Sequence, residues 1–296
     1  MKLIFSRKGF DSQYGGCASP IFPDGTIASL PIPVSEGGST KFGDLRVGDI
    51  DLGKVVSELS RTKGRSRLTR SAAVHLDPDL DRHVMARPAG WRPAFGQIAA
   101  AQGHLTNQGV DRGDLFLFFG WFKRVEQRDG AWSYVRGAPN LHVLFGWLQI
   151  ADVVSVRSNH EKRVAIGRYP WLAQHPHADE DWEPESENNT IYVAERKLRL
   201  AGMGSSFAGG GIFRRFQPAL PLTREGYSRC HWRLPPWFMP SSRKPALSYH
   251  PGEKAWKQLD DAVHLRTVGK GQEFVLDCAH YPQSVQWAAN LIEAGA

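Results

Sequence analysis

The stretch DLFLFFGWFKRVEQ, residues 114–127, decides the fold class of this 296-residue chain. Its aromatic and aliphatic residues are typical of a long β-strand, and two similar runs follow, AWSYV at 131–135 and LHVLFGWLQIADVVSV at 141–156. An Asp-Gly turn at 129–130 separates the first two runs, and a polar loop precedes the third. The centre of the chain is therefore predicted to form two or three long antiparallel strands.

The triplet FGW occurs twice in these runs, at Phe119–Trp121 and at Phe145–Trp147. Glycine inside a strand marks a bend or a close approach of another backbone. We therefore predict matched glycines where paired strands bend in a small barrel. Nothing else in the chain recurs, so a repeat architecture is not indicated.

Helical and strand-like segments are interspersed outside this centre, without the regular strand–helix–strand order of a doubly wound sheet. The spacing of Leu52, Val55, Val56 and Leu59 predicts a helix with Gly64 as its stop, and further helices are predicted at 93–104, 253–258 and 282–294. Strands are predicted at 3–5, 72–77, 189–200 and 272–277. The predicted fold class is α+β, with a mixed, mainly antiparallel sheet or a small β-barrel, and flanking helices.

The domain organisation follows from the absence of a long linker rich in Pro, Gly or Ser. We predict a single domain over residues 1–296. Its sub-regions are a ligand-loop and helical part at 1–109, a β-rich part at 110–200 and a C-terminal α+β part at 201–296.

Composition narrows the function classes. A net charge of +7 and a pI near 9.4 favour an anionic partner such as nucleic acid, although a solvated basic surface is the alternative. No apolar run approaches the roughly 18–20 residues of a membrane span. Three widely spaced cysteines without a CxxC motif suggest neither a disulfide framework nor a cysteine zinc site, so a reducing, cytoplasmic location is expected.

A polar, glycine-rich cluster, SRKGFDSQYGGCASPIFPDG at 6–25, follows the first predicted strand. Arg7 and Lys8 are suited to holding phosphate, and Asp11 to accepting a hydrogen bond or a proton. Gly15 and Gly16 would let a backbone approach a phosphate closely. The alternative is a turn-rich connection with Asp11 as a cap, since neither GxxxxGK[ST] nor GxGxxG is present.

A second candidate site is HLDPDLD at 75–81. Residues two apart in an extended chain share a face, so His75, Asp77 and Asp79 are expected to point the same way, although Pro78 interrupts the strand. Such a trio suits a divalent metal or general acid–base chemistry. The alternative is a strand that ends in an Asx turn.

A third polar group lies in GWRPAFGQIAAAQGHL at 90–105. On the helix predicted there, Gln97 shares a face with His104, and an amide side chain is a natural reader of a base edge. Arg92 adds a charge before the helix. The alternative is a set of buried polar groups that bond to the backbone.

Two further motifs have mainly structural interpretations. HPHAD at 175–179 has two histidines that could bind a metal, but its proline and its acidic neighbours favour an exposed loop. The basic run RTKGRSRLTR at 61–70 is either a track for a phosphate backbone or a solvated loop.

The motifs SRKGFDSQYGG, SPIFPDG, SLPIP, HLDPDL, GWRPAFGQ, HLTNQGV, GDLFLFFGWF and LHVLFGWLQI together resemble the third type of nucleotide modification associated domain. The resemblance runs through most of the chain. It implies a role in modifying nucleic-acid bases in phage and bacterial systems, with no settled reaction. By the family pattern, the site residues are Ser6, Arg7, Lys8, Asp11, His75, Asp77, Arg92, Gln97 and His104.

A second, local resemblance covers about a fifth of the chain. GDLFLFFGWF and LFGWLQIADVV are similar to the central strands of PUA-like base-binding barrels. This resemblance implies a PUA-like centre that holds a flipped or unpaired base.

Three functions compete at this point: a base- or nucleotide-modifying transferase, a non-catalytic reader of modified DNA or RNA, and a metal-dependent hydrolase or nuclease that uses His75, Asp77 and Asp79. We favour the transferase, with nucleotide or nucleic acid as partner, DNA in preference to RNA, partner enzymes of the same pathway and no membrane contact. The cofactor is open, and no metal ligand is assigned. The predicted catalytic residues are Asp11, His75, Asp77 and His104, and the predicted substrate-binding residues are Ser6, Arg7, Lys8, Gly15, Gly16, Ser19, Arg92 and Gln97.

Overall fold

The computed structural model describes residues 1–34, 38, 40–60, 67–182, 188–200, 206–269 and 273–295. Most of the basic run at 61–70 therefore lies outside the described residues. Within the described part of the chain, no helix has both the length and the apolar character that a membrane crossing requires.

The main sheet has nine strands: β1 (Lys2–Arg7), β2 (Ser19–Ile21), β7 (Ala94–Gln97), β8 (Leu115–Arg128), β9 (Ala131–Tyr134), β10 (Leu141–Ser155), β11 (Thr190–Ala194), β12 (Gly210–Ile212) and β16 (Glu273–Asp277). Its path is β16–β1–β8–β10–β11–β7, with β2 and β9 beside β8 and β12 beside β10. β1 and β2 run parallel to β8, and the other pairs are antiparallel.

Three small sheets and four α-helices complete the described fold. The small sheets are β13 (His231–Leu234), β15 (Val263–Arg266) and β14 (Trp256–Gln258); β3 (Ile32–Pro33) and β6 (Val74–His75); and β4 (Arg46–Val47) and β5 (Ile50–Asp51). The α-helices are α1 (Leu52–Leu59), α2 (Ala99–Asn107), α3 (Asn159–Arg168) and α4 (Gln283–Gly295). Short 3₁₀ turns are η1 (Phe42–Asp44), η2 (Pro170–Gln174), η3 (Pro176–Ala178), η4 (Pro236–Phe238) and η5 (Glu253–Ala255).

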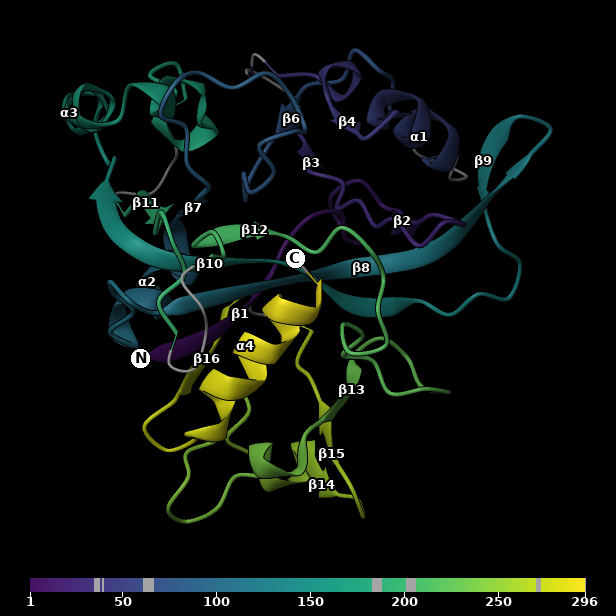
Figure 1. Cartoon of the computed structure of the whole chain (residues 1–296), viewed down its shortest axis with the longest axis vertical. Helices are drawn as coiled ribbons and strands as arrows, with labels where there is room; N and C mark the ends of the chain where they lie inside the picture. The colour runs from purple at the N-terminus through teal and green to yellow at the C-terminus, as the bar shows by residue number, and fades with distance from the viewer. Residues whose placement is uncertain are drawn as a thin grey trace.

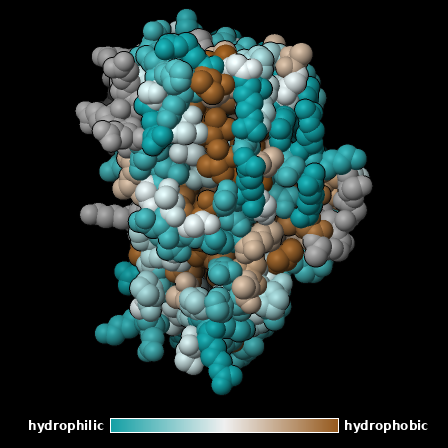
Figure 2. Space-filling view, turned by 90° about the vertical axis from the view of Figure 1, so that its left-hand side faces the viewer, coloured by the Kyte–Doolittle hydropathy of each residue, from teal (hydrophilic) through white to brown (hydrophobic). Residues whose placement is uncertain are grey.

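The long strands β8 and β10 cross the middle of the molecule, with α1, β3, β6 and α3 on one side and α4 and the β13–β15 sheet on the other (Figure 1). Both faces of the strands are therefore covered, and every residue from Leu115 to Phe119 is buried. A continuous apolar run rather than an alternating one is what such burial requires. The side that carries α2 and α3 is mostly hydrophilic, with a narrow hydrophobic strip in its upper half (Figure 2).

The fold prediction is confirmed as α+β with a mixed, mainly antiparallel sheet. The described strands form an open sheet, so the alternative small barrel is not formed. The helix predicted at 253–258 is wrong, since one 3₁₀ turn there leads into β14.

The two FGW glycines are not paired with each other, contrary to our expectation. Gly120 lies opposite Val143, whereas Gly146 lies opposite Phe118, beyond an irregularity in the register. A β-carbon on Gly120 would stand 2.8 Å from the Lys8 carbonyl oxygen, and one on Gly146 would stand 2.6 Å from a Leu80 methyl carbon. Each glycine therefore allows a different neighbouring segment to approach its strand: the chain at Lys8 for Gly120 and the chain at Leu80 for Gly146.

His142 on β10 is expected to make the free energy of unfolding depend on pH. Its Nδ1 accepts a hydrogen bond from Trp232 Nε1 at 3.0 Å. Burial, and then the charges of Arg229 and Arg7, lower the pKa of His142 to about 3. An unfolded histidine has a pKa of about 6.5. Below that pH only the unfolded chain takes up this proton, so the free energy of unfolding falls by about 1.4 kcal/mol per pH unit until the folded pKa is reached.

Urea unfolding at neutral pH and about one unit below the unfolded pKa checks this, with His142→Asn as the comparison. The variant can still accept from Trp232 but does not titrate, so it should lose less stability than the wild type on acidification, by about 1.4 kcal/mol. Equal losses in the two proteins would contradict the assignment to His142.

Candidate functional site

Four side chains meet on one side of the main sheet, and we call them the histidine–aspartate cluster: His75, Asp77, His175 and His177. His75 ends β6 and Asp77 follows it. His177 lies in η3, and His175 immediately precedes that turn. A donor atom from each of His75, Asp77 and His177 lies within 4.8 Å of the other two.

The Asp77 carboxylate is the centre of the cluster and is 5% exposed. Its Oδ1 accepts a hydrogen bond from the Gly96 backbone N–H at 2.7 Å. His175 Nε2 lies 3.5 Å from the same oxygen, and His177 Nε2 lies 3.8 Å from Oδ2. The two carboxylate oxygens therefore face different partners.

Strand β7 holds the cluster in place. Asp79 and Ala94 exchange backbone hydrogen bonds at 2.9 and 3.0 Å, which aligns the chain around Asp77 with β7. A side chain at Gly96 would overlap the His177 ring, so the glycine lets η3 approach the strand. Trp182 closes the group, with its ring centroid 5.1 Å from that of His177 and 5.7 Å from that of His75.

Hydrogen bonds fix the tautomer of His177. Asn189 Nδ2 donates to the carbonyl oxygens of Val156 and His177 at 3.2 and 3.0 Å, so Asn189 Oδ1 is the atom beside His177 Nδ1, at 2.6 Å. Nδ1 must then carry the proton that is donated to Oδ1. In a neutral ring this leaves Nε2 with a lone pair that faces Asp77.

The electrostatics favour neutral rings at His75 and His177. Burial lowers the pKa of His177 to about 3. Burial also lowers the pKa of His75, and the charge of Lys8 acts in the same direction. For Asp77, burial raises the pKa, but the nearby His175, His177 and His75 outweigh this effect and bring the value to about 2. At neutral pH the cluster therefore offers lone pairs on nitrogen and oxygen.

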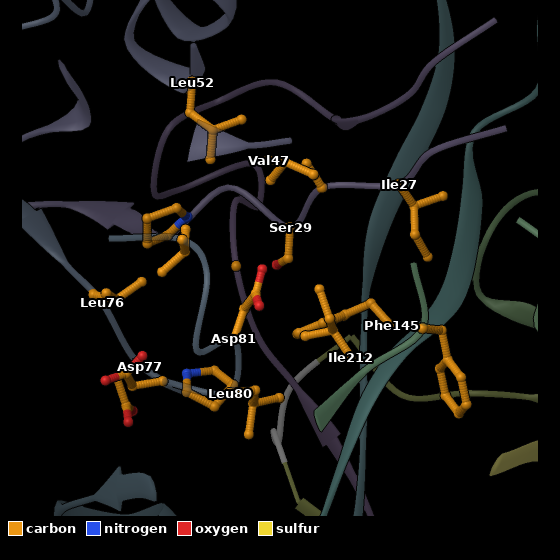
Figure 3. A pocket seen from close by; sticks show the side chains of 17 residues that line it. Ile27, Ser29, Val47, Leu52, Leu76, Asp77, Leu80, Asp81, Phe145 and Ile212 are labelled. Carbon is orange, nitrogen blue, oxygen red and sulfur yellow. The ribbon is translucent and has the colours of Figure 1, made fainter. Parts of the chain in front are cut away.

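The cluster opens on a cavity of about 530 Å³ whose lining includes His75, His175, Asp179, Asp181 and Trp182. A smaller, mostly apolar cavity lies along the chain from Leu76 to Asp81. In Figure 3 the Asp77 side chain stands at the edge of this smaller cavity, below Leu76 in the view, while Asp81 points toward Ser29.

Asp79 does not join His75 and Asp77, although the strand spacing predicted a shared face. Its carboxylate pairs with Arg87, whose Nη1 donates a hydrogen bond to it at 2.8 Å. The same carboxylate accepts a hydrogen bond from Trp91 Nε1 at 3.1 Å. His177 takes the third position instead. The expectation of an exposed loop at HPHAD is wrong for the two histidines, which are both 3% exposed.

Lys8 and Gln97 meet at Glu273, which the sequence analysis did not single out. Glu273 Oε1 lies 2.9 Å from Lys8 Nζ and accepts from Gln97 Nε2 at 2.5 Å. Lys8 Nζ also lies 4.6 Å above the centre of the Phe95 ring. Ser6 pairs with Glu273 across β1 and β16, and its side chain is buried beside this group.

Gln97 and His104 do not share a helix, so that expectation is wrong. Residues 94–97 form β7 because they pair with β11, and α2 begins only at Ala99. His104 Nε2 lies 3.0 Å from Ser248 Oγ, and its ring lies 4.2 Å from that of Tyr249.

The other predicted residues of the N-terminal loop have structural contacts. Asp11 Oδ1 accepts from the backbone N–H groups of Gln13 and Tyr14, both at 2.7 Å, which makes an Asx turn. Gly15 and Gly16 have φ values of +76° and +71° in that turn. Two further bonds involve predicted residues of this loop: Leu30 N–H donates to Ser19 Oγ at 3.0 Å, and Arg7 Nη2 donates to the Gly269 carbonyl oxygen at 3.0 Å.

Arg92 lies in a separate cavity of about 560 Å³, which we call the arginine cavity. Its guanidinium donates to the Ala194 carbonyl oxygen. The lining of this cavity includes four arginines, three aromatic side chains, a histidine and two carboxylates: Arg82, Arg92, Arg196, Arg214, Trp91, Trp147, Phe207, His83, Asp81 and Glu195. The segment from His75 to His83 contributes residues to this cavity and to the one at the cluster.

Comparison with known proteins gives one match. Residues 2–277 match the family described as nucleotide modification associated domain 3, which confirms the resemblance seen in the motifs. No curated protein and no solved structure matches the chain. The chain therefore belongs to the nucleotide modification associated domain 3 family, whose description indicates a role in nucleotide or nucleic-acid modification.

Proposed function

We propose that this chain is an enzyme that modifies a nucleotide or a nucleic-acid base, and that its reaction centre is the histidine–aspartate cluster. One observation carries the proposal: a buried carboxylate lies among imidazoles from a distant segment, beside a cavity of about 530 Å³. Titratable groups with pKa values shifted by burial and by specific partners are typical of active sites.

The cavity beside the cluster is suited to a base. Its size falls within the range of small-molecule sites. Trp182 lines it and offers an aromatic face for stacking, while Asp179 and Asp181 are acceptors for the amino and imino groups of a base edge. A reader of modified nucleic acid would also need such a pocket, but it would not need the neutral imidazoles directed at Asp77.

The arginine cavity is suited to the phosphate groups of the same substrate. Arginine holds phosphate through paired N–H donors, and Trp91 and Trp147 add stacking surfaces. Because the segment from His75 to His83 lines both cavities, a nucleotide chain that follows it would place a phosphate at one cavity and a base at the other. Group transfer to that base is the reaction class we favour.

The test is mass spectrometry of nucleosides from DNA, RNA and the free nucleotide pool of cells that express the full chain. We compare the wild type with His75→Gln and with His160→Gln, an exposed histidine on α3 that serves as the matched control. A new nucleoside is expected with the wild type and with His160→Gln, and at least about 100-fold less with His75→Gln.

A different outcome would count against the proposal. Equal product from His75→Gln and the wild type would remove the cluster from the reaction. Unchanged nucleosides in all three pools would reject a modifying enzyme and favour a reader, which binding to modified oligonucleotides would then measure.

A further inference from the structure

The three donor atoms of His75, Asp77 and His177 have the spacing of ligands around one ion. Nitrogen and oxygen ligands lie about 2.0–2.2 Å from Zn²⁺, so two ligands of one ion lie roughly 3–3.5 Å apart. His177 Nε2 and Asp77 Oδ2 are 3.8 Å apart, and all three donors lie within 4.8 Å. Shifts of a few tenths of an ångström to about 1 Å would bring them onto a common centre.

The tautomer of His177 places two acceptors opposite each other, one on this ring and one on Asp77. Because Nδ1 donates its proton to Asn189, Nε2 directs a lone pair at a carboxylate oxygen. Two buried lone pairs that face each other repel unless a shared donor or a cation lies between them, and a metal ion would satisfy both. An outer hydrogen bond that fixes the ring of a histidine is also the usual companion of a metal ligand.

The two oxygens of Asp77 are used differently. Oδ1 accepts from the Gly96 N–H at 2.7 Å and faces His175 Nε2 at 3.5 Å. His175 Nδ1 accepts from the His177 backbone N–H at 3.3 Å, so in a neutral ring Nε2 carries the proton and cannot be a ligand. Oδ2 remains for a cation, and His175 orients the carboxylate.

We propose that His75, Asp77 and His177 bind one divalent transition-metal ion through two imidazole nitrogens and one carboxylate oxygen. Divalent ions such as Zn²⁺ and Fe²⁺, which are borderline, and the harder Mn²⁺ fit a nitrogen–oxygen donor set that contains no sulfur. Three protein ligands leave coordination positions open, which is the pattern of a catalytic site. His75 lines the adjacent cavity, so these positions face the space that we assign to the substrate.

This inference deepens the proposed function, since it concerns the same site, but ion binding is measurable without turnover. The proposed ligands differ from the trio His75, Asp77 and Asp79 that was predicted for a hydrolase. Asp79 is bonded to Arg87, and His177 supplies the third donor.

The experiment is calorimetric titration of the chelator-treated full chain with Zn²⁺ and with Mn²⁺. One equivalent per chain is expected. His177→Gln and Asp77→Asn should each weaken binding by at least about 100-fold, and His175→Gln by about 10–100-fold, as for an outer partner. His160→Gln should bind as the wild type does. Circular dichroism confirms that each variant is folded, and Co²⁺ absorption gives a spectral signature that loss of a ligand changes.

If His177→Gln fails to fold, His75→Gln on the cavity side replaces it. Binding of less than one equivalent by the wild type, or an affinity that no cluster variant lowers, would overturn the metal site. Product formation that survives complete metal removal would overturn a catalytic role of the ion and leave the modification proposal standing. Stoichiometric ion binding without a new nucleoside would support the metal site and count against the modification proposal.

Discussion

Replacing Asp79 with alanine is expected to lower the free energy of unfolding by about 3–5 kcal/mol, because it leaves a buried guanidinium without its counter-charge. The Arg87 side chain is 4% exposed and donates to both carboxylate oxygens of Asp79. Trp91 Nε1 would lose its acceptor in the same variant. Asp79 would thus be needed for folding, whereas Asp77 would be needed for the reaction.

Urea unfolding followed by circular dichroism measures this loss, with Asp129→Asn in the exposed turn between β8 and β9 as the control. Asp129 has a φ of +51°, which asparagine also tolerates, so the control should be within about 0.5 kcal/mol of the wild type. The double variant Asp79→Ala, Arg87→Met should recover part of the loss, because no buried charge remains. A loss of less than 1 kcal/mol in the single variant would show that Arg87 is not held by this pair.

The folded fraction of Asp79→Ala should bind Zn²⁺ as the wild type does. Asp79 has its own partners and gives no donor atom to the cluster. Weakened ion binding in a folded sample would mean that the pair with Arg87 also positions Asp77.

Replacing Gly96 with alanine is expected to reduce both Zn²⁺ affinity and product formation by about 100-fold. The added β-carbon would overlap the His177 ring, so the ring must move away from Asp77. A displacement of about 1 Å at a reaction centre costs on the order of 10²-fold in rate. The protein should lose about 1–3 kcal/mol of stability as well, as is usual for overpacking.

Gly103→Ala on α2 is the matched control for this substitution. Among the described residues its β-carbon would meet only Asn188 Nδ2, at 3.7 Å, and alanine is the better helix former, so stability should be unchanged or slightly higher. Unchanged ion binding in Gly96→Ala would mean that η3 can shift with its histidine, and that β7 does not set the geometry of the cluster.

The sequence was sufficient to predict an element where a local pattern reflects burial of both faces of a strand or of one stripe of a helix. The apolar runs at 114–127 and 141–156 predicted β8 and β10, and the spaced aliphatic residues Leu52, Val55, Val56 and Leu59 predicted α1, which ends at Leu59 and so before the expected stop at Gly64. It also predicted candidate site residues in HLDPDL, of which the structure places His75 and Asp77 in the histidine–aspartate cluster. In each case the information lies within a few residues of chain.

The residues that complete the site were decided only by the tertiary structure. His177 lies 100 positions after Asp77 in the sequence, and its own neighbourhood of proline and acidic residues indicated an exposed loop. It is buried because Gly96 lets η3 pack on β7 and because Asn189 accepts its Nδ1 proton. Likewise, only the pairing of β7 with β11 made Gln97 a strand residue beside Glu273. Local patterns report which face of a segment is buried, whereas a site depends on which distant segments share that buried space.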